Sequence, residues 1–341
     1  MKALAKTDAG PGLELIDAPV PALRRDEVLV KVFAGGICGT DLHIYQWDPW
    51  ARSRIVPPRV IGHEFCGTVG QIGPEVTQVA VGDFVSAEGH VACGACHSCR
   101  TGSPHICERL AIIGVDRDGG FADYVAVPAG NVWKLDASIP RDVGAVMDPL
   151  GNAVHTALQT PLVGKTVAVI GCGPIGLMAI PICHLAGAAL VVASDVHEQR
   201  LALARRMGAD LVLNAATDDV PARVREATGG RGADVVLEMS GHPNGLRDGL
   251  RALGNGGWVS LLGLPSGPIE IDLANDVIFK ETHLAGVFGR RMWETWEQAS
   301  ALLKMGLDIT PVITHRFPLE RFEEAFSLLR SGEAGKVILY L

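Results

Sequence analysis

Short runs of apolar, strand-forming residues fill the first part of the chain. Segments such as EVLVKVFA, GTVGQIG and GDFVSAE are separated by Gly and Pro turns, and few long helical periods interrupt them. Runs of this length, bounded by turn residues, are typical of strands. The pattern therefore predicts a β-rich N-terminal domain over residues 1–145.

From about Val146 the pattern changes to strands that alternate with helices. The segments are TVAVIG, PIGLMAIPICHLAG, ALVVASD, EQRLALARRMG and DLVLNA, then ADVVLEMSG, NGLRDGLRALG, GWVSLLGL and HLAGVFG. This alternation predicts an α/β domain over residues 146–294, with a doubly wound parallel sheet covered by helices on both faces. Residues 295–341 follow, from the amphipathic ETWEQASALLKMG to the short strand KVILYL. We expect that strand to pair back onto the N-terminal domain.

One stretch is long enough to cross a membrane, because the 28 residues from Thr166 to Ala193 carry no formal charge. Glycines and prolines interrupt it repeatedly, which favours strand, turn, helix and strand over a single spanning helix. Pro181 falls inside the predicted helix, where it removes a backbone hydrogen bond, and we expect a kink there.

Composition narrows the class of protein further. A length of 341 residues favours two domains. With 38 acidic and 30 basic residues the net charge is −8, and no dense run of Lys and Arg is present. We therefore expect no nucleic-acid partner and no membrane partner. The N-terminus MKALAKTDAG has no signal-peptide pattern, so we expect a cytoplasmic protein with reduced thiols.

Four cysteines lie close together in the segment CGACHSCRTGSPHIC. Cys93, Cys96, Cys99 and Cys107 follow the spacing C-x2-C-x2-C-x7-C. Four thiolates on tight turns can close a tetrahedral zinc site, which has no open position and so serves to hold a loop. Disulfides and an iron–sulfur cluster are the alternatives. We favour zinc, because the usual bacterial cluster run places its fourth cysteine after three residues.

A second group of potential metal ligands occurs in the segments GICGTDLH and IGHEFCG. Cys38, His63 and Glu64 offer a thiolate, an imidazole and a carboxylate. Three protein ligands with an open position form a catalytic zinc site. Thr40 and His43 follow Cys38, and a hydroxyl followed by an imidazole can relay a proton to solvent. The simpler alternatives are packing of Cys38 and His63 in the core and an exposed loop histidine at position 43.

The glycine motif GCGPIG follows the predicted strand TVAVI directly. Gly171, Gly173 and Gly176 fit G-x-G-x-x-G at the start of a helix, and Asp195 comes 19 residues after Gly176. In this context the motif indicates a dinucleotide site, with the pyrophosphate at the helix N-terminus and the carboxylate on the ribose. An acidic residue there favours NAD over NADP, although Arg200 leaves the preference open. The alternative is a glycine-rich turn without a ligand.

These features together resemble the medium-chain, zinc-dependent alcohol dehydrogenase superfamily over essentially the whole chain. The segments that carry the closer resemblance are CGTDLHIYQWDPW, EGHVACGACHSCRTGSPHIC, DPLGNAVHTAL, EMSG, ITHRF and GKVIL. They are similar to the bacterial members that oxidise L-threonine. Members that act on polyols usually have EPL where this chain has Asp148, Pro149 and Leu150.

The resemblance implies a GroES-like catalytic domain, a Rossmann domain, NAD as cofactor and two zinc ions per chain. It implies that Cys38, His63 and Glu64 hold the catalytic zinc and that Cys93, Cys96, Cys99 and Cys107 hold the structural one. It also implies a proton relay through Thr40 and His43, with Asp148 near the metal. NAD contacts are implied for Ile175, Asp195, Arg200, Leu262, Gly263, Leu264, Gly286 and Val287, beside the motif glycines.

The implied reaction is oxidation of the β-hydroxyl of L-threonine to 2-amino-3-oxobutanoate by a homotetramer. Substrate charges have candidate partners in Trp47, Asp48, Trp50, His90, Arg290 and Arg291. Two alternatives remain open. One is a zinc- and NAD-dependent dehydrogenase of another secondary alcohol, such as 2,3-butanediol or a polyol. The other is a nucleotide-binding redox sensor without catalysis.

Overall fold

The computed structural model describes residues 1–332 and 334–341. These residues form two compact units. Unit 1 comprises residues 1–149, 291–296 and 313–341, and unit 2 comprises residues 150–290 and 297–312. The chain therefore leaves unit 1 after residue 149 and returns to it twice. The division into folding domains at residues 145 and 294 stays a prediction.

Unit 1 is built from strands with short helices between them. Its strands are β1 (Lys2–Lys6), β2 (Glu14–Asp17), β3 (Glu27–Gly36), β4 (Arg59–Val60), β5 (Glu64–Ile72), β6 (Phe84–Ala87), β7 (His90–Val91), β8 (Ala111–Ile112), β9 (Tyr124–Pro128), β10 (Val132–Lys134), β17 (Ile313–Pro318) and β18 (Lys336–Tyr340). Its helices are α1 (Gly39–Gln46), α2 (Pro49–Arg54), α3 (His97–Arg100), α4 (Arg141–Ala145) and α11 (Phe322–Ser331), with short turns of 3-10 helix between some of them. The predicted β-rich N-terminal part is thus confirmed.

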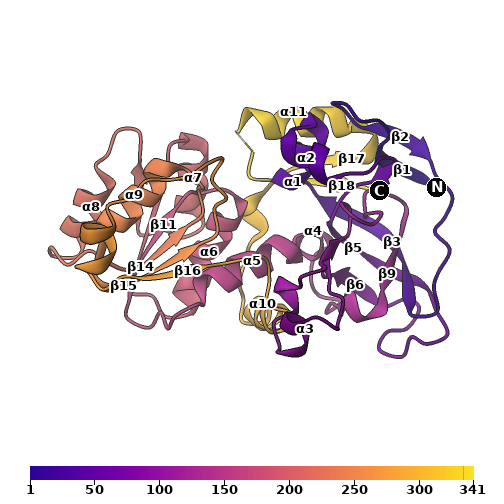
Figure 1. The fold of residues 1–341 in the computed structure, drawn as a ribbon, viewed down its shortest axis with the longest axis horizontal. Coiled ribbons are helices and arrows are strands. Elements are labelled where there is room, and N and C mark those ends of the chain that lie inside the picture. Colours follow the sequence, from indigo (N-terminus) through magenta and orange to yellow (C-terminus); the bar gives the residue numbers. More distant parts are fainter. Residues whose placement is uncertain (333) are drawn as a thin grey trace. The chain divides into compact units, whose positions relative to one another are not determined.

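A seven-stranded sheet is the centre of unit 1, with the order β10-β6-β5-β3-β18-β17 and with β9 paired to β3. Strand β18, from the end of the chain, runs antiparallel to β3, so that Ile338 faces Gly36. Figure 1 shows this C-terminal yellow segment beside the indigo β3. The expected return of KVILYL to the N-terminal module is therefore confirmed. Valines of β3, β5 and β9 pack together in the apolar core of this sheet.

Unit 2 alternates strands and helices as the periodicity predicted. Its strands are β11 (Thr166–Ile170), β12 (Leu190–Asp195), β13 (Leu211–Asn214), β14 (Ala233–Glu238), β15 (Leu253–Leu261) and β16 (His283–Gly286). Its helices are α6 (Pro174–Leu185), α7 (Glu198–Arg206), α8 (Val220–Ala227) and α9 (Pro243–Ala252), with a π-helical segment at Leu273–Ile278. Helices α5 (Met147–Ala157) and α10 (Glu294–Lys304) each have residues in both units.

All strand pairs in the sheet of unit 2 are parallel, and their order is β13-β12-β11-β14-β15-β16. The chain thus winds outward from β11 in one direction and then from β14 in the other. The carboxyl ends of β11 and β14 lie side by side at the point where the direction changes, which is where doubly wound folds bind nucleotides. The predicted doubly wound α/β fold is confirmed.

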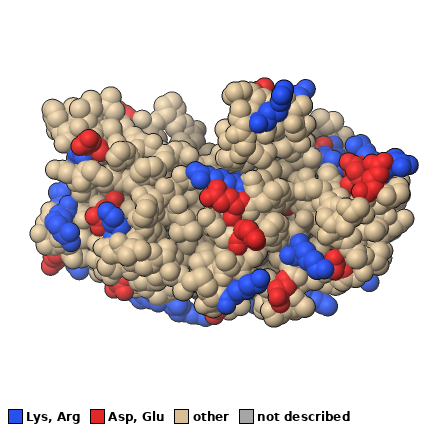
Figure 2. Space-filling model, turned by 90° about the horizontal axis from the view of Figure 1, so that it is seen from below, with Lys and Arg blue, Asp and Glu red and all other residues tan. Residues whose placement is uncertain are grey.

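The uncharged stretch from Thr166 to Ala193 folds as β11, α6 and β12. Helix α6 continues past Pro181 as far as Leu185, while the kink that we expect at this proline stays a prediction. Among the described residues, no helix combines the length and the apolarity that crossing a membrane requires. Charges of both signs are interspersed on the face of the molecule in Figure 2.

Candidate metal centres and cofactor site

The first candidate metal centre lies where β3 and β5 pair. Gly36 at the end of β3 is opposite Glu64 at the start of β5, and Cys38 follows two residues later as the N-cap of α1. This register brings a sulfur, an imidazole nitrogen and a carboxylate oxygen of Cys38, His63 and Glu64 within 4.8 Å of one another. A Cβ at Gly36 would lie 2.3 Å from Glu64 Oε2, so glycine leaves the space that this carboxylate occupies.

A buried carboxylate supports the imidazole of this group. Asp41 Oδ2 accepts a hydrogen bond from the Cys38 backbone N–H at 2.9 Å, and Asp41 Oδ1 lies 3.7 Å from His63 Nδ1. Burial opposes a charge on His63, but the Asp41 carboxylate and the Cys38 sulfur outweigh burial and raise the pKa of His63 to about 10. The negative groups around His63 thus favour a positive charge at this position. A carboxylate behind a histidine is also the usual outer partner of a zinc-bound imidazole, so the donor set fits a metal ion.

Lys336 is a member of this site that sequence reasoning missed. It is the first residue of β18, and its side chain is almost fully buried. Its Nζ lies 2.7 Å from Glu64 Oε1 and 2.6 Å from Oε2, and donates to the carbonyl of Ile37 at 3.0 Å. The available signal was a single lysine at the start of the otherwise apolar strand KVILYL. Such a residue is rarely buried unless it has a partner.

The predicted relay residues are placed on one helix. Thr40 lies in the first turn of α1, with its Oγ1 3.9 Å from Cys38 Sγ, and His43 is three residues further along, on the same side of the helix. Asp148, in the first turn of α5, is buried. A Cβ at Gly89 would lie 3.5 Å from Asp148 Oδ2 and 3.6 Å from the Cβ of His63, so this carboxylate is a neighbour of the metal ligands. Asp148 is not a member of the group of potential metal ligands formed by Cys38, His63 and Glu64.

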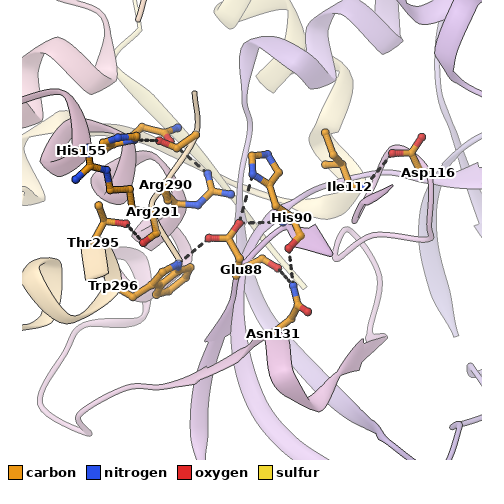
Figure 3. Close-up of polar contacts among 12 residues, drawn as sticks. Glu88, His90, Ile112, Asp116, Asn131, His155, Arg290, Arg291, Thr295 and Trp296 are labelled. Carbon is orange, nitrogen blue, oxygen red and sulfur yellow. Dashed lines mark hydrogen bonds and ion pairs between the residues drawn. The ribbon is translucent and has the colours of Figure 1, made fainter. Parts of the chain in front are cut away.

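A second buried carboxylate, also missed by sequence reasoning, lies beside His90. Glu88 is fully buried, and its carboxylate accepts hydrogen bonds from Trp296 Nε1 at 2.7 Å and from the His90 backbone N–H at 2.9 Å (Figure 3). Asn131 donates to the carbonyls of residues 88 and 90 at 2.8 and 2.9 Å. The turn that carries Gly89 is therefore held rigidly next to the metal ligands. His90, one of the expected substrate partners, directly follows Gly89 in this turn.

The four cysteines of the second candidate centre converge. One ligand atom from each of Cys93, Cys96, Cys99 and Cys107 lies within 4.8 Å of the others. The sulfur of Cys96 is 3.4 Å from that of Cys99 and 3.8 Å from that of Cys107. A disulfide requires about 2.05 Å, whereas sulfurs held at about 2.3 Å from one zinc ion are separated by about 3.8 Å. All eight cysteines are unbridged.

Hydrogen-bond donors around this cluster lower the pKa of Cys93 and Cys96, whereas burial and the neighbouring thiols raise the pKa of Cys99. The nearby backbone N–H groups of Ala95 and Cys96, together with the Arg109 guanidinium, lower the pKa of Cys93 to about 5. Arg109 Nη2 lies 3.4 Å from Cys93 Sγ, and the Arg109 backbone N–H donates to Cys107 Sγ at 3.3 Å. Deprotonated sulfur is the form that binds metal, so the surroundings fit a closed structural zinc site.

The glycine motif in unit 2 forms a tight turn between β11 and α6. Gly171 has φ +97°, and a Cβ at Gly176 would lie 2.0 Å from the Gly171 carbonyl oxygen. Gly173 is the N-cap of α6, and a Cβ there would meet nothing within 4 Å. Two of the glycines are therefore required by the packing of the protein itself, while the third borders open space at a helix N-terminus. This arrangement fits a pyrophosphate.

The other predicted NAD residues lie at the same edge of the sheet, at the carboxyl ends of its strands. Asp195 ends β12 and accepts hydrogen bonds from the backbone N–H groups of Cys172 at 2.8 Å and His197 at 2.9 Å. Arg200 Nη1 lies 3.7 Å from Asp195 Oδ2. Ile175 is in the first turn of α6, Leu262, Gly263 and Leu264 follow β15, and Gly286 ends β16 before Val287.

Glu238 at the end of β14 supports this edge and was not predicted. Its Oε1 accepts the backbone N–H of Ser240 at 3.0 Å, and its carbonyl accepts that of Leu262 at 2.9 Å. A Cβ at Gly263 would lie 2.7 Å from Glu238 Oε2. This acidic residue therefore joins the turns after β14 and β15. The sequence signal that could have identified it was the segment EMSG.

Comparison with known proteins places these sites in a family. Residues 24–137 match the alcohol dehydrogenase GroES-like domain, and residues 174–305 match the zinc-binding dehydrogenase domain. The L-threonine 3-dehydrogenases of Symbiobacterium thermophilum and Bacillus subtilis are both 51% identical to the chain. Each alignment covers 99% of this chain, with 97% of the first relative and 98% of the second.

Solved structures of the same fold are more distant in sequence. Galactitol-1-phosphate dehydrogenase from Escherichia coli is 30% identical, with a TM-score of 0.91 over 100% of both chains. The 2R,3R-butanediol dehydrogenase from Bacillus subtilis is 28% identical, with a TM-score of 0.90 over 100% of this chain and 99% of its own. The Cys38, His63 and Glu64 group fits the catalytic zinc of such enzymes, and the four cysteines fit the structural zinc. Full-length identity of about half, two matched domains and both ligand groups establish that the chain belongs to the zinc-dependent medium-chain alcohol dehydrogenases.

Proposed function

We propose that the chain oxidises the β-hydroxyl of L-threonine to 2-amino-3-oxobutanoate and transfers the hydride to NAD. The observation that carries the chemistry is the convergence of Cys38, His63 and Glu64 beside Thr40. The choice of threonine is supported by the relatives of that activity, which are about half identical over the full length. Composition and spacing alone lead only to a secondary alcohol.

Different residues of unit 1 bind the metal and carry the proton away from the alcohol. When zinc is bound by Cys38, His63 and Glu64, it supplies a Lewis acid that lowers the pKa of a hydroxyl brought to it. The Thr40 hydroxyl accepts the alcohol proton and passes its own proton toward His43, whose half-exposed ring releases it to water. Asp148 and Lys336 add a negative and a positive charge around the ligands.

Unit 2 supplies the cofactor site in this proposal. NAD, when bound, is the hydride acceptor. The open N-terminus of α6 at Gly173 receives the pyrophosphate, and Asp195 receives the ribose hydroxyls. The carboxylate repels a 2′-phosphate, which favours NAD. Leu262, Gly263, Leu264, Gly286 and Val287 border the nicotinamide half of the cofactor.

We also propose the homotetramer and the cytoplasmic location. Strand β16 is an edge strand of its sheet, and large apolar side chains near it are exposed. These are Leu273, Ile278, Phe279 and Leu284. An unpaired edge with apolar neighbours favours pairing with a second copy. Sedimentation of the wild type and of Phe279→Asp tests this: the proposal expects dissociation of the variant, and a monomeric wild type contradicts it. The unbridged cysteines support a reducing compartment.

The decisive experiment follows NADH formation with L-threonine, D-threonine, 2,3-butanediol and sorbitol, before and after chelator treatment. Selective turnover of L-threonine that chelation abolishes supports the proposal. Turnover of 2,3-butanediol alone favours the second candidate, for which the solved butanediol dehydrogenase of the same fold is the supporting observation. Absence of turnover with one zinc per chain favours a redox sensor.

A matched pair of variants tests the relay. Thr40→Val removes the hydroxyl at nearly constant volume, and we expect kcat to fall by about 10²–10⁴. Thr7→Val removes an exposed hydroxyl that bonds Glu14 at the surface of unit 1 and should leave kcat unchanged. Equal activity of the two variants would exclude Thr40 from the relay.

A further inference from the structure

The relay histidine has a carboxylate partner that the proposed reaction does not yet use. His43 Nδ1 lies 2.6 Å from Asp48 Oδ2. The His43 ring also lies 6.0 Å from that of Trp50, at an interplanar angle of 60°. The ring is 56% exposed, so the core of the protein does not fix its orientation. Asp48 and Trp50, from the start of the following helix α2, contact the ring instead.

Asp48 is itself held firmly. Its other carboxylate oxygen, Oδ1, accepts a hydrogen bond from the Ala51 backbone N–H at 2.9 Å and so caps α2. The preceding residue, Trp47, has φ 55° and ends α1, so the chain reverses between the two helices. Arg52 Nε donates to the Trp47 carbonyl at 2.8 Å, which closes this turn. The carboxylate therefore has little freedom to turn away from His43.

The pair contributes little to stability, because water screens the attraction between exposed charges. The effect of the pair is to orient the His43 ring. The hydrogen bond made by one imidazole nitrogen decides which nitrogen carries the proton. A carboxylate only accepts, so it holds the proton of neutral His43 on Nδ1 and leaves Nε2 as the free base.

We propose that Asp48 is a positioning residue for the proton relay, which holds His43 in the Nδ1–H tautomer so that Nε2 accepts the proton from the Thr40 side. The effect of Asp48 on the reaction rate rests on the proposed function, whereas its effect on the His43 tautomer does not. It also gives Asp48 a role different from substrate recognition, because both carboxylate oxygens are engaged within the protein. No bond is made or broken at Asp48. The proton leaves the alcohol, passes through Thr40 and His43, and reaches water.

Two substitutions separate orientation from helix capping. Serine is as good an N-cap as aspartate, but its side chain is too short to reach Nδ1 as well, so Asp48→Ser keeps the cap and frees His43. Asp48→Asn keeps the cap through its single side-chain oxygen and turns an NH2 donor toward Nδ1, which favours the opposite, Nε2–H tautomer. Asp219→Ser is the matched control, because Asp219 caps α8 in unit 2 through the Ala222 backbone N–H at 3.0 Å.

The first readout is nitrogen NMR of protein with ¹⁵N-labelled histidine, which reports the tautomer of His43 independently of activity. We expect the Nδ1–H form in the wild type and a mixture of tautomers in Asp48→Ser, with Asp219→Ser unchanged. The same tautomer in the wild type and Asp48→Ser, or an Nε2–H form in the wild type, would overturn the proposal. Because this measurement needs no substrate, it stands even if threonine turnover fails.

The second readout is a double-mutant cycle in L-threonine oxidation. Asp48→Ser should lower kcat about tenfold and leave KM for NAD unchanged, with a loss at least as large in Asp48→Asn and with Asp219→Ser like the wild type. In a His43→Ala background, Asp48→Ser should have no further effect, because Asp48 acts only through His43. Imidazole in the buffer should restore His43→Ala but not Asp48→Ser, in which the His43 ring is still present. Independent, additive losses in the cycle, or a tenfold loss in Asp219→Ser, would show a merely structural role.

Discussion

Replacing Lys336 with methionine tests whether the buried ion pair with Glu64 belongs to the metal centre. The substitution removes an ammonium that lies 2.6–2.7 Å from both carboxylate oxygens and keeps most of the side-chain volume. Glu64 and Lys336 are both almost fully buried, so the carboxylate is left with an uncompensated charge. Breaking a buried pair in this way costs about 3–5 kcal/mol.

The free-energy cost of Lys336→Met should depend on whether zinc is bound. With zinc bound, the metal ion faces the same carboxylate, so the variant loses mainly the hydrogen bonds and packing of Lys336, about 1–2 kcal/mol. The difference between the metal-free and zinc-loaded forms is therefore about 2–3 kcal/mol. By linkage, the open site of Lys336→Met should bind zinc about 30- to 150-fold more tightly than that of the wild type.

The assay is urea unfolding of chelator-stripped and zinc-loaded protein, with zinc competition at the Cys38 site. Each comparison of the variant with the wild type is made within one form, so the loss of structural zinc cancels. Lys280→Met is the control, since Lys280 in unit 2 donates to the backbone carbonyls of Leu250 and Leu253 at 2.6 and 2.9 Å rather than to a carboxylate. Adding Glu64→Gln should recover most of the metal-free loss. Equal losses in the two forms, or no recovery with Glu64→Gln, would refute this account of the pair.

Three further predictions concern the cofactor site and the thiols. Gly176→Ala places a Cβ 2.0 Å from the Gly171 carbonyl oxygen and should lower both the melting temperature and the affinity for NADH. Gly173→Ala should lower the affinity for NADH alone. Equal melting temperatures for the two variants would contradict the packing argument. Asp195→Asn should weaken NAD binding and narrow the preference for NAD over NADP, measured as the ratio of kcat/KM values, and an unchanged ratio would place the ribose elsewhere. Burial raises the pKa of Cys66 and of Cys183 to about 12, so at pH 8 only about one thiol in 10⁴ is a thiolate. Mass spectrometry should therefore find these two cysteines unalkylated in folded protein at pH 8, with the rate rising as the pH rises, and rapid labelling at pH 8 would show that they are accessible.

Local pattern predicted the elements and the chemistry of this protein to a large extent. The change from short strand-like runs to alternating strands and helices gave the two kinds of fold, because side-chain periodicity is a local property. The cysteine spacing and the glycine motif after TVAVI likewise depend on short loops, in which residues close in sequence are close in space. The four cysteine sulfurs and the turn at Gly171 are therefore where the sequence places them.

Other features depend on contacts between segments that are far apart in the chain. The register of β3 and β5 sets Gly36 opposite Glu64, and β18 brings Lys336 to the same carboxylate from 272 residues away. Glu88 meets Trp296 across 208 residues. The contact of Asp48 with His43 could not be predicted from the sequence although the two residues are only five positions apart, because it depends on the left-handed turn at Trp47.

The sequence by itself pointed to the four clustered cysteines as candidate zinc ligands and to the glycine turn as a candidate dinucleotide site, because their chemistry and short-loop spacing are written in neighbouring positions. Only the tertiary structure decided which charges surround those ligands. Strand register and chain return are set by the burial of whole sheet faces, and that free energy is shared among residues from every part of the chain.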